Sequence, residues 1–418
     1  MKFHLRMLMG PWAAAAALGF ALAIGVMRGT PYLGEGMWTV RWFALGLWMV
    51  WPVIAALSAV DAARLTTPEA RYLVLTARHG QRGYTAAAAW AAVPSAVVHL
   101  LVILTALAIG SVAHPRGGWP IIALAILAQL STFLWFAALG SFIGRLLSPV
   151  LAGVVALAAS LGLAQVLTNM GLGARGGFNP LGDSGASVSQ IGLTWNPVHL
   201  VVQILVLAVT AMVLMMPRPQ VVAGKLAPGF GTLAAAGITA LALIALPALI
   251  PGESLLAVPV APSACSGERP TICVFPEHER LAGPLVDDVR RLMDAADAHG
   301  YTSLIPERVE EASHRHIPAD GKTLRSLGFV ERETPGMAEL IQTLVYPSWC
   351  PAVSSEEPPP SEFWLSLDSV VVTWMGLINE EYQPGVGGMA LTPDGVASLM
   401  TAWQRCDVSA DAPTPATE

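Results

Sequence analysis

The chain has 418 residues, of which 54% are hydrophobic and only 12% are charged, and its mean hydropathy is +0.58. Soluble globular domains usually carry about 25% charged residues, so this composition excludes an ordinary soluble protein and predicts an integral membrane protein. Residues 1–250 hold 13 Lys/Arg and 4 Asp/Glu, a net of +9, whereas residues 251–418 hold 10 Lys/Arg and 25 Asp/Glu, a net of −15. The sequence therefore predicts a basic membrane half and an acidic water-soluble half.

A helical span needs about 20 apolar residues. Seven windows meet this requirement, at roughly residues 9–27, 40–60, 86–112, 119–144, 149–170, 197–216 and 231–250. The first has no small-residue cleavage site before a polar chain, so we do not expect a removable signal peptide. Gly25-x-x-x-Gly29 and Gly140-x-x-x-Gly144 have the spacing that permits close helix approach, although an Ala- and Gly-rich chain also produces it by chance.

The positive-inside rule gives the orientation of these spans. If the N-terminus is cytoplasmic, the inner segments carry nine basic residues: Lys2, Arg6, Arg64, Arg71, Arg78, Arg82, Arg145, Arg218 and Lys225. The outer loops of the membrane half then carry four: Arg28, Arg41, Arg116 and Arg175. We therefore expect a multi-pass plasma-membrane protein with an inner N-terminus and an extracellular acidic domain.

A charged stretch, "TTPEARYLVLTARHGQRGY" (residues 66–84), lies between the second and third windows. Thr67-Pro68-Glu69 is typical of a helix start, with a hydroxyl cap, a first-turn proline and an early carboxylate. Gly80 follows Arg78 and His79 and is a plausible helix end. The segment 61–85 is therefore expected to hold a short helix at the cytoplasmic membrane face; the alternative is a solvated basic loop that only fixes topology.

Residues 61–84 resemble the segment after the second span of ABC transporter permeases of the ABC-type-2 class. The matching residues are Asp61, Arg64, Thr67, Glu69, Leu73, Leu75 and Arg82. The chain departs from the family pattern at two places. Family members commonly have Glu-Arg where this chain has Asp61 and Arg64, and they commonly have Pro where this chain has Arg78 or His79.

This resemblance implies a six-helix core over about residues 1–216, with a short inner link "GRLLSP" (144–149) and an outer segment at 171–195. We expect that Gly-rich, nearly uncharged outer segment to dip partly into the membrane. Residues 217–250 would form a cytoplasmic link and a seventh span. The acidic domain beyond resembles the extra extracellular domain of some actinobacterial permeases.

The resemblance also implies that the segment 61–85 docks on a separate ABC ATPase subunit, and that two membrane subunits pair as a homodimer or heterodimer in the bilayer. The candidate ATPase contacts are Arg64, Glu69, Arg71, Arg78 and Arg82. A phosphate-binding loop needs G-x-x-x-x-G-K-[ST], and the nearest stretch, "AGKL" (223–226), lacks the first Gly and the hydroxyl. We therefore expect no catalytic residues, cofactor or nucleic-acid partner for this chain itself.

Polar residues at membrane depth are costly and often functional. His99 and His199 fall within or at the edge of spans, as do Gln129, Gln165 and Gln203. The two histidines are candidates for a transport path, and interhelical hydrogen bonding is the alternative role.

The acidic domain, residues 251–407, holds all four cysteines: Cys265, Cys273, Cys350 and Cys406. This distribution favours two disulfides in an oxidising compartment over a zinc site, because no paired C-x-x-C spacing is present. Cys265–Cys273 and Cys350–Cys406 are the favoured pairings, although three are possible. His314-x-His316 has no third ligand at a known spacing, so no metal site is predicted, and residues 408–418 are expected to be a disordered tail.

The domain's sequence predicts a small α+β fold. Strands are expected at 271–275 and 302–306, and helices at 277–299 and near 335–345, 361–379 and 393–406. We expect the whole chain to be an exporter permease whose substrate class the sequence leaves open among drug, peptide, lipid and polysaccharide. The alternative is a non-transporting membrane scaffold or sensor whose outer domain binds an envelope ligand.

Overall fold

The computed structural model describes residues 9–27, 34–67, 81–110, 118–167, 178–182, 185–186, 189–216, 220–222, 225–227, 230–250, 252–279, 282–313, 324–328, 336–350, 353, 359–385 and 387–409. The chain divides into two compact units. The first unit is Met1–Ser187 with Thr194–Leu256, and the second is Val188–Leu193 with Ala257–Glu418. Each unit is described by itself.

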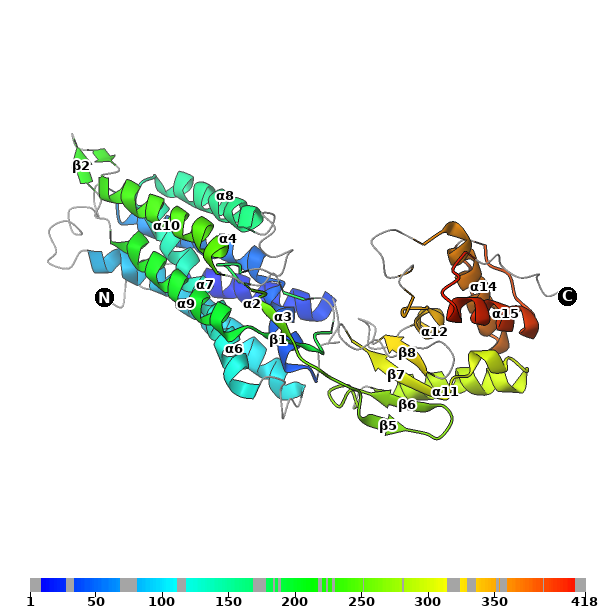
Figure 1. Ribbon diagram of the computed structural model, residues 1–418. Helices are drawn as coiled ribbons and strands as arrows, with labels where there is room; N and C mark the ends of the chain where they lie inside the picture. The colour runs from blue at the N-terminus through cyan, green and yellow to red at the C-terminus, as the bar shows by residue number, and fades with distance from the viewer. Residues whose placement is uncertain are drawn as a thin grey trace. The chain divides into compact units, whose positions relative to one another are not determined.

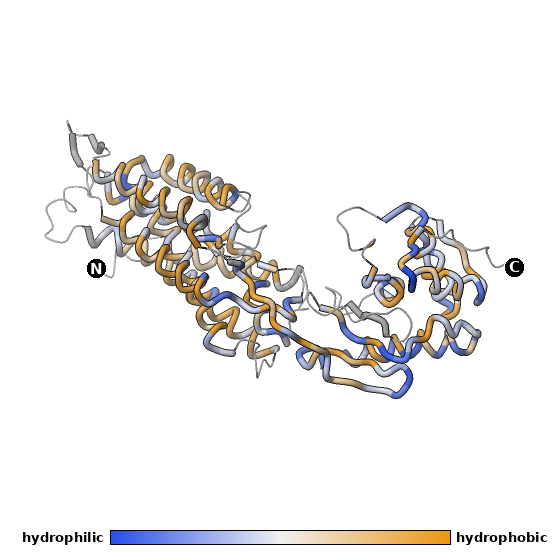
Figure 2. Tube along the Cα trace, viewed as in Figure 1, coloured by the Kyte–Doolittle hydropathy of each residue, from blue (hydrophilic) through white to orange (hydrophobic). Residues whose placement is uncertain are grey.

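The first unit is a bundle of apolar helices (Figures 1 and 2). Its helices are α2 (Gly10–Met27), α3 (Gly36–Ala44), α4 (Leu47–Arg64), α6 (Gln81–Ile109), α7 (Gly118–Gly144), α8 (Pro149–Leu167), α9 (Pro197–Met215) and α10 (Phe230–Leu249). The short strands β2 (Gln220–Val222) and β3 (Lys225–Ala227) form an antiparallel hairpin. β1 (Leu193–Trp195) pairs with β4 (Leu255–Ala257), and the division between the two units falls within both of these strands.

Five described helices are long and apolar enough to span a membrane: Leu47–Arg64, Gly83–Ile109, Gly118–Gly144, Pro149–Leu167 and Pro197–Met215. The other two predicted spans contain shorter apolar stretches, Gly10–Gly25 and Phe230–Ala245. Large apolar side chains are exposed along several of these helices, among them Val150, Val154, Leu233 and Leu241. A surface of this kind suits lipid rather than water, so the structure supports a polytopic helical membrane protein.

The helices pack through small residues. α4 contacts α7 and α8, α7 also contacts α9, and α2 contacts α6. At Gly140 and Gly144 of α7, an added Cβ would overlap the backbone carbonyl oxygens of Ala55 and Ala59 in α4. The spacing at Gly140 therefore does mark a close helix approach, whereas nothing lies within 4 Å of a Cβ built on Gly25.

The predicted span at 40–60 is divided in the structure into α3 and α4. In a continuous helix the Arg41 carbonyl would accept the Leu45 N–H, but it instead accepts the N–H of Ala186 at 3.3 Å, while the Leu45 N–H bonds to Trp42 O at 3.2 Å. The helix therefore breaks at residues 45–46 because a distant segment takes one of its backbone acceptors.

The described residues of the second unit form a four-stranded sheet, a three-residue 3-10 turn and four helices. The sheet order is β5 (Ala264–Ser266), β6 (Thr271–Val274), β7 (Arg308–Ala312) and β8 (Leu324–Gly328). β5 runs antiparallel to β6, and the remaining pairs are parallel. The other elements are α11 (Ala282–Ala298), η2 (Thr302–Leu304), α12 (Met337–Val345), α14 (Ser361–Leu377) and α15 (Pro393–Gln404).

The strand at 271–275 and the helices near 335–345, 361–379 and 393–406 are confirmed, and two predictions need correction. The helix predicted at 277–299 begins only at Ala282. Residues 302–306 are not a strand: residues 302–304 form the 3-10 turn, held by the Leu304 N–H bond to Tyr301 O at 3.0 Å. The next strand begins at Arg308 because this turn first returns the chain from α11 to the sheet.

The second unit has its own apolar core. Ile272 and Val309 of the sheet are buried with Leu292 of α11 and Trp374 of α14. The Trp374 indole N–H donates to Leu292 O at 2.9 Å, which satisfies the polar atom of this large buried side chain.

Candidate functional site

The first candidate region is the end of the bundle at which α4, α7 and α9 finish and α6 begins, called here the basic end. Arg64, in the last turn of α4, has a side chain that is 44% exposed and lies 3.4 Å from the Asp61 carboxylate. Glu69, Arg71 and Arg78 lie outside the described residues, as does the side chain of Arg82. The predicted ATPase contacts at these positions therefore remain predictions.

The described residues do show where the segment 61–85 leaves and re-enters the bundle. The end of α4 tightens into a turn, with the Leu65 N–H bonded to Ala62 O at 3.1 Å and the Thr66 N–H to Ala63 O at 3.0 Å. A Cβ built on Gly83, in the first turn of α6, would lie 3.6 Å from the Leu65 Cδ1. The two ends of the segment therefore lie close to each other.

Asp61 ties the start of α2 to the end of α4. Its carboxylate is fully buried and accepts the backbone N–H of Met9 at 2.7 Å, immediately before α2 begins. A carboxylate at this position complements the partial positive charge of the α2 amino end. The Asp61 position that carries the family resemblance is therefore a helix-capping position in this fold.

Arg145 follows the last residue of α7, and its side chain is buried at the basic end. The guanidinium donates to the carbonyl oxygens of Leu214 at 2.5 Å and Met215 at 3.4 Å, in the last turn of α9, and to Ser141 O at 3.2 Å. The carboxyl end of a helix has unpaired carbonyls and a partial negative charge, so a cation stabilises it. Burial lowers the pKa of Arg145 to about 10, and the group remains charged at neutral pH.

Two aromatic rings complete the surroundings of Arg145. Its guanidinium carbon lies 5.6 Å from the ring centre of Tyr84 and 5.7 Å from that of Phe142. Tyr84 is buried in the first turn of α6, at the carboxyl end of the segment 61–85. The sequence indicates Arg145 only as an inner positive charge, and the one signal of a further role is that it is a lone arginine between two apolar spans.

At the opposite end of the bundle, the segment around residues 178–186 packs onto α3. The Trp38 indole N–H donates to Ala186 O at 3.3 Å, and the Arg41 guanidinium donates to Gly185 O at 3.4 Å. Phe178 and Leu181 are buried as well. Residues 178–182 and 185–186 of the predicted outer segment therefore pack against the helical bundle.

The two histidines lie in different contacts. His99 Nε2 is 2.9 Å from Gln129 Oε1, and the Gln129 amide donates to Val40 O at 3.1 Å, so this pair joins α6, α7 and α3. His199 contacts the ring of Phe178, with ring centres 5.5 Å apart. The His99 geometry is that of interhelical hydrogen bonding; a role of either histidine in a transport path stays a prediction.

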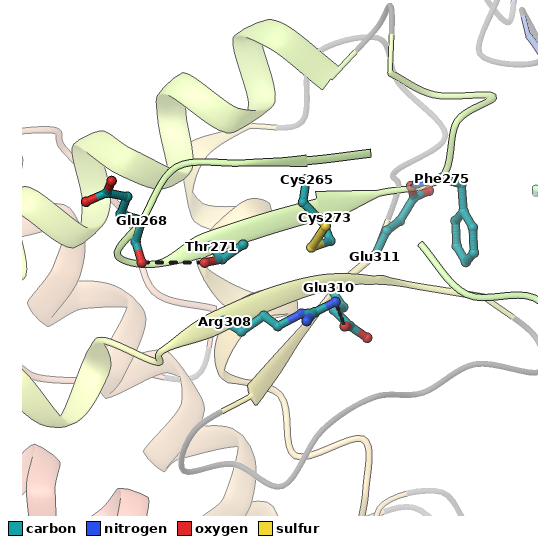
Figure 3. The surroundings of a disulfide bond; sticks show 8 residues. All are labelled: Cys265, Glu268, Thr271, Cys273, Phe275, Arg308, Glu310 and Glu311. Atoms are coloured by element: carbon teal, nitrogen blue, oxygen red, sulfur yellow. Dashed lines mark hydrogen bonds and ion pairs between the residues drawn. A yellow bond between two sulfur atoms is a disulfide. The ribbon is translucent and has the colours of Figure 1, made fainter. Parts of the chain in front are cut away.

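The second unit holds both predicted disulfides, Cys265–Cys273 and Cys350–Cys406. Cys265 and Cys273 are direct cross-strand partners of β5 and β6, and Figure 3 shows this bond beside Arg308 and Glu310 of β7. Cys350–Cys406 instead joins the segment after α12 to the end of α15. Among the described residues, no group of three or more His, Cys, Asp or Glu side chains is placed to hold a metal; His314 and His316 lie outside the described residues.

A buried polar pair that sequence reasoning missed lies at the carboxyl ends of β6 and β7. His278 Nδ1 is 2.5 Å from Glu311 Oε1, and the other carboxylate oxygen accepts the Phe275 N–H at 2.8 Å. Both side chains are almost fully buried. The pair links the end of β6 to β7. Because solvent does not reach the two side chains, the pair is not an open reactive site.

Comparison of the chain with protein-family models, with curated proteins and with solved structures finds no match.

Proposed function

We propose that this chain is the membrane-spanning subunit of an ATP-driven exporter of the ABC-type-2 class. Its helices would form the substrate path in the plasma membrane, paired with a second membrane subunit, and a separate ATPase would bind beneath the segment 61–85. The chain itself would be no enzyme. The N-terminus would lie inside the cell and the disulfide-bonded unit outside.

Two observations carry the proposal: the segment 61–85 is anchored to the bundle at both ends, and its sequence resembles the corresponding segment of ABC-type-2 permeases. Leu65 and Gly83 bring the two ends of the segment together, Asp61 joins one end to α2, and Tyr84 joins the other to Arg145. A segment held in this way passes a rigid-body displacement to several spans, as coupling to nucleotide-driven movement requires.

The orientation is supported by the distribution of charge and by the disulfides. Arg64 and Arg145 lie at the basic end, which the positive-inside rule assigns to the cytoplasm. Disulfides persist in oxidising compartments, which fits an extracellular second unit.

The proposal is tested by purifying the chain with candidate ATPase subunits and measuring co-elution and ATP turnover. A Glu69→Arg variant should lose the complex, because reversal of one charge at a docking surface opposes a complementary partner. Glu268→Arg, an exposed site in the second unit, is the matched control and should keep it. Failure of the unaltered chain to bind any such ATPase would contradict the proposal.

The alternative function is a membrane scaffold or sensor. It is favoured by one observation, the separate apolar core of the second unit, which suits a domain that binds a ligand on its own. Binding of an envelope component by the full chain, with no dependence of any ATPase on the chain, would favour this function.

A further inference from the structure

Arg145 has an unusual position: one buried cation contacts three helices that meet at the basic end. It belongs to the link after α7, it donates to carbonyls of α9, and its guanidinium lies over a ring of α6. The residues that meet here, Tyr84, Arg145 and Leu214, are far apart in the sequence, and each of the three helices is long enough to cross a membrane.

The chemistry of the contact is specific for arginine. The planar guanidinium presents several N–H donors at once, so it bonds to successive α9 carbonyls while its face remains over Tyr84. A lysine ammonium is a compact point charge that cannot keep these contacts in the same geometry. Removing the cation takes this donor from the Leu214 carbonyl and separates the α6 contact from the α9 contact.

Tyr84 connects the Arg145 contact to the segment 61–85. It is a buried aromatic residue at the carboxyl end of the segment 61–85, and Gly83 beside it lies near Leu65 at the other end of that segment. A displacement of the segment therefore reaches Tyr84 before it reaches the rest of α6. The next described group in contact with that ring is the Arg145 guanidinium, which is bonded to α9.

We infer that Arg145 is a positioning residue that makes the start of α6 and the ends of α7 and α9 move as one body, so that movement of the segment 61–85 is transmitted to α9. The transmission step rests on the proposed function; the mechanical linkage of the three helices does not.

The linkage is tested by spin-label distance measurements on the purified full chain. All four cysteines are in disulfides, so labels can be placed on introduced cysteines alone. The reporting pair is Ala86→Cys on α6 with Met216→Cys at the end of α9, both at exposed positions. The reference pair is Leu101→Cys with Leu205→Cys, exposed positions in the middle of the same two helices.

Replacement of Arg145 by Met should broaden the distance distribution of the reporting pair and leave that of the reference pair unchanged. Arg145→Lys should give an intermediate width. Tyr84→Phe should behave as the unaltered chain, because the ring is kept, whereas Tyr84→Ala should broaden the reporting pair. An unchanged reporting pair in Arg145→Met, or equal broadening of both pairs, would overturn the inference.

A second measurement separates this inference from the proposed function. When an ATPase partner binds, nucleotide should shift the reporting distance in the unaltered chain and not in Arg145→Met, although the complex persists and ATP is still hydrolysed. If no ATPase binds the unaltered chain, the proposed function fails, and the distances in the chain alone still decide the role of Arg145.

Discussion

Gly140 of α7 lies directly against the backbone of Ala55 in α4, so that an added Cβ would overlap the Ala55 carbonyl oxygen. Gly144 repeats this contact one turn later, against Ala59. Between helices in lipid, close packing replaces the hydrophobic effect as a driving force, so small residues at such a contact determine how near two spans approach.

Gly140→Val should therefore destabilise the bundle by about 1–3 kcal/mol, because the new side chain forces α4 and α7 apart. Gly162→Val on α8 is the matched control, since nothing lies within 4 Å of a Cβ at that position. Thermal unfolding of both variants in one detergent measures the difference. Equal unfolding midpoints for the two variants would show that the contact between α4 and α7 contributes little to the stability of the bundle.

The two disulfides should differ in their contribution to the stability of the second unit. Cys350 and Cys406 are 56 residues apart, whereas Cys265 and Cys273 are 8 apart. From loop-closure entropy, removing the first should cost about 4 kcal/mol and removing the second about 2.5 kcal/mol.

Paired Cys→Ser variants of the full chain, unfolded in urea and followed by protease sensitivity of the second unit, test this order. Replacing both partners of one bond avoids a free thiol that would exchange with the other bond. A larger loss for the Cys265–Cys273 variant would contradict the loop-length argument.

Features that depend on local pattern were predictable from the sequence. Five of the seven predicted apolar windows correspond to helices long enough to span a membrane, and the start of α15 follows from Thr392-Pro393-Asp394, a typical helix-capping sequence. The break between α3 and α4 was not predictable, because it depends on the Ala186 N–H competing for the Arg41 carbonyl. The contacts of Arg145 were missed for the same reason: their partners on α6 and α9 are close only after folding.

Alkaline pH should destabilise the second unit. Burial, and then the neighbouring Asp368 carboxylate, raises the pKa of Tyr382 above its ordinary value of 10.0. Burial also raises the pKa of Tyr301 and Tyr346. Because the folded unit favours the neutral phenols, the unfolded chain loses these protons first: the stabilisation is complete below the unfolded pKa of 10.0 and is lost as pH rises through the higher folded values.

Absorbance titration of the phenols tests the cause of this shift at Tyr382, whose hydroxyl donates to Asp368 Oδ1 at 3.0 Å. Asp368→Asn removes the negative charge with little change in shape and should lower the Tyr382 pKa, with Tyr382→Phe identifying its signal. If Asp368→Asn leaves the titration unchanged, burial alone sets the pKa.

Among the carboxylates of the sheet, Glu311 should be the one whose replacement lowers the stability of the second unit most. Its two oxygens bond to His278 and to the Phe275 N–H inside the fold, so Glu311→Ala leaves a buried imidazole and a buried N–H without their acceptor. Loss of one partner of a buried pair typically costs about 3–5 kcal/mol. Glu380 is a control, because it forms a surface ion pair with Arg291 in which both side chains are partly exposed, and its truncation should cost at most about 1 kcal/mol. Urea unfolding of the two variants measures both values, and Glu311→Gln, which keeps a carbonyl acceptor, should fall between Glu311→Ala and the unaltered chain. Similar losses for Glu311→Ala and Glu380→Ala would show that the pair with His278 adds no stability beyond that of a surface ion pair.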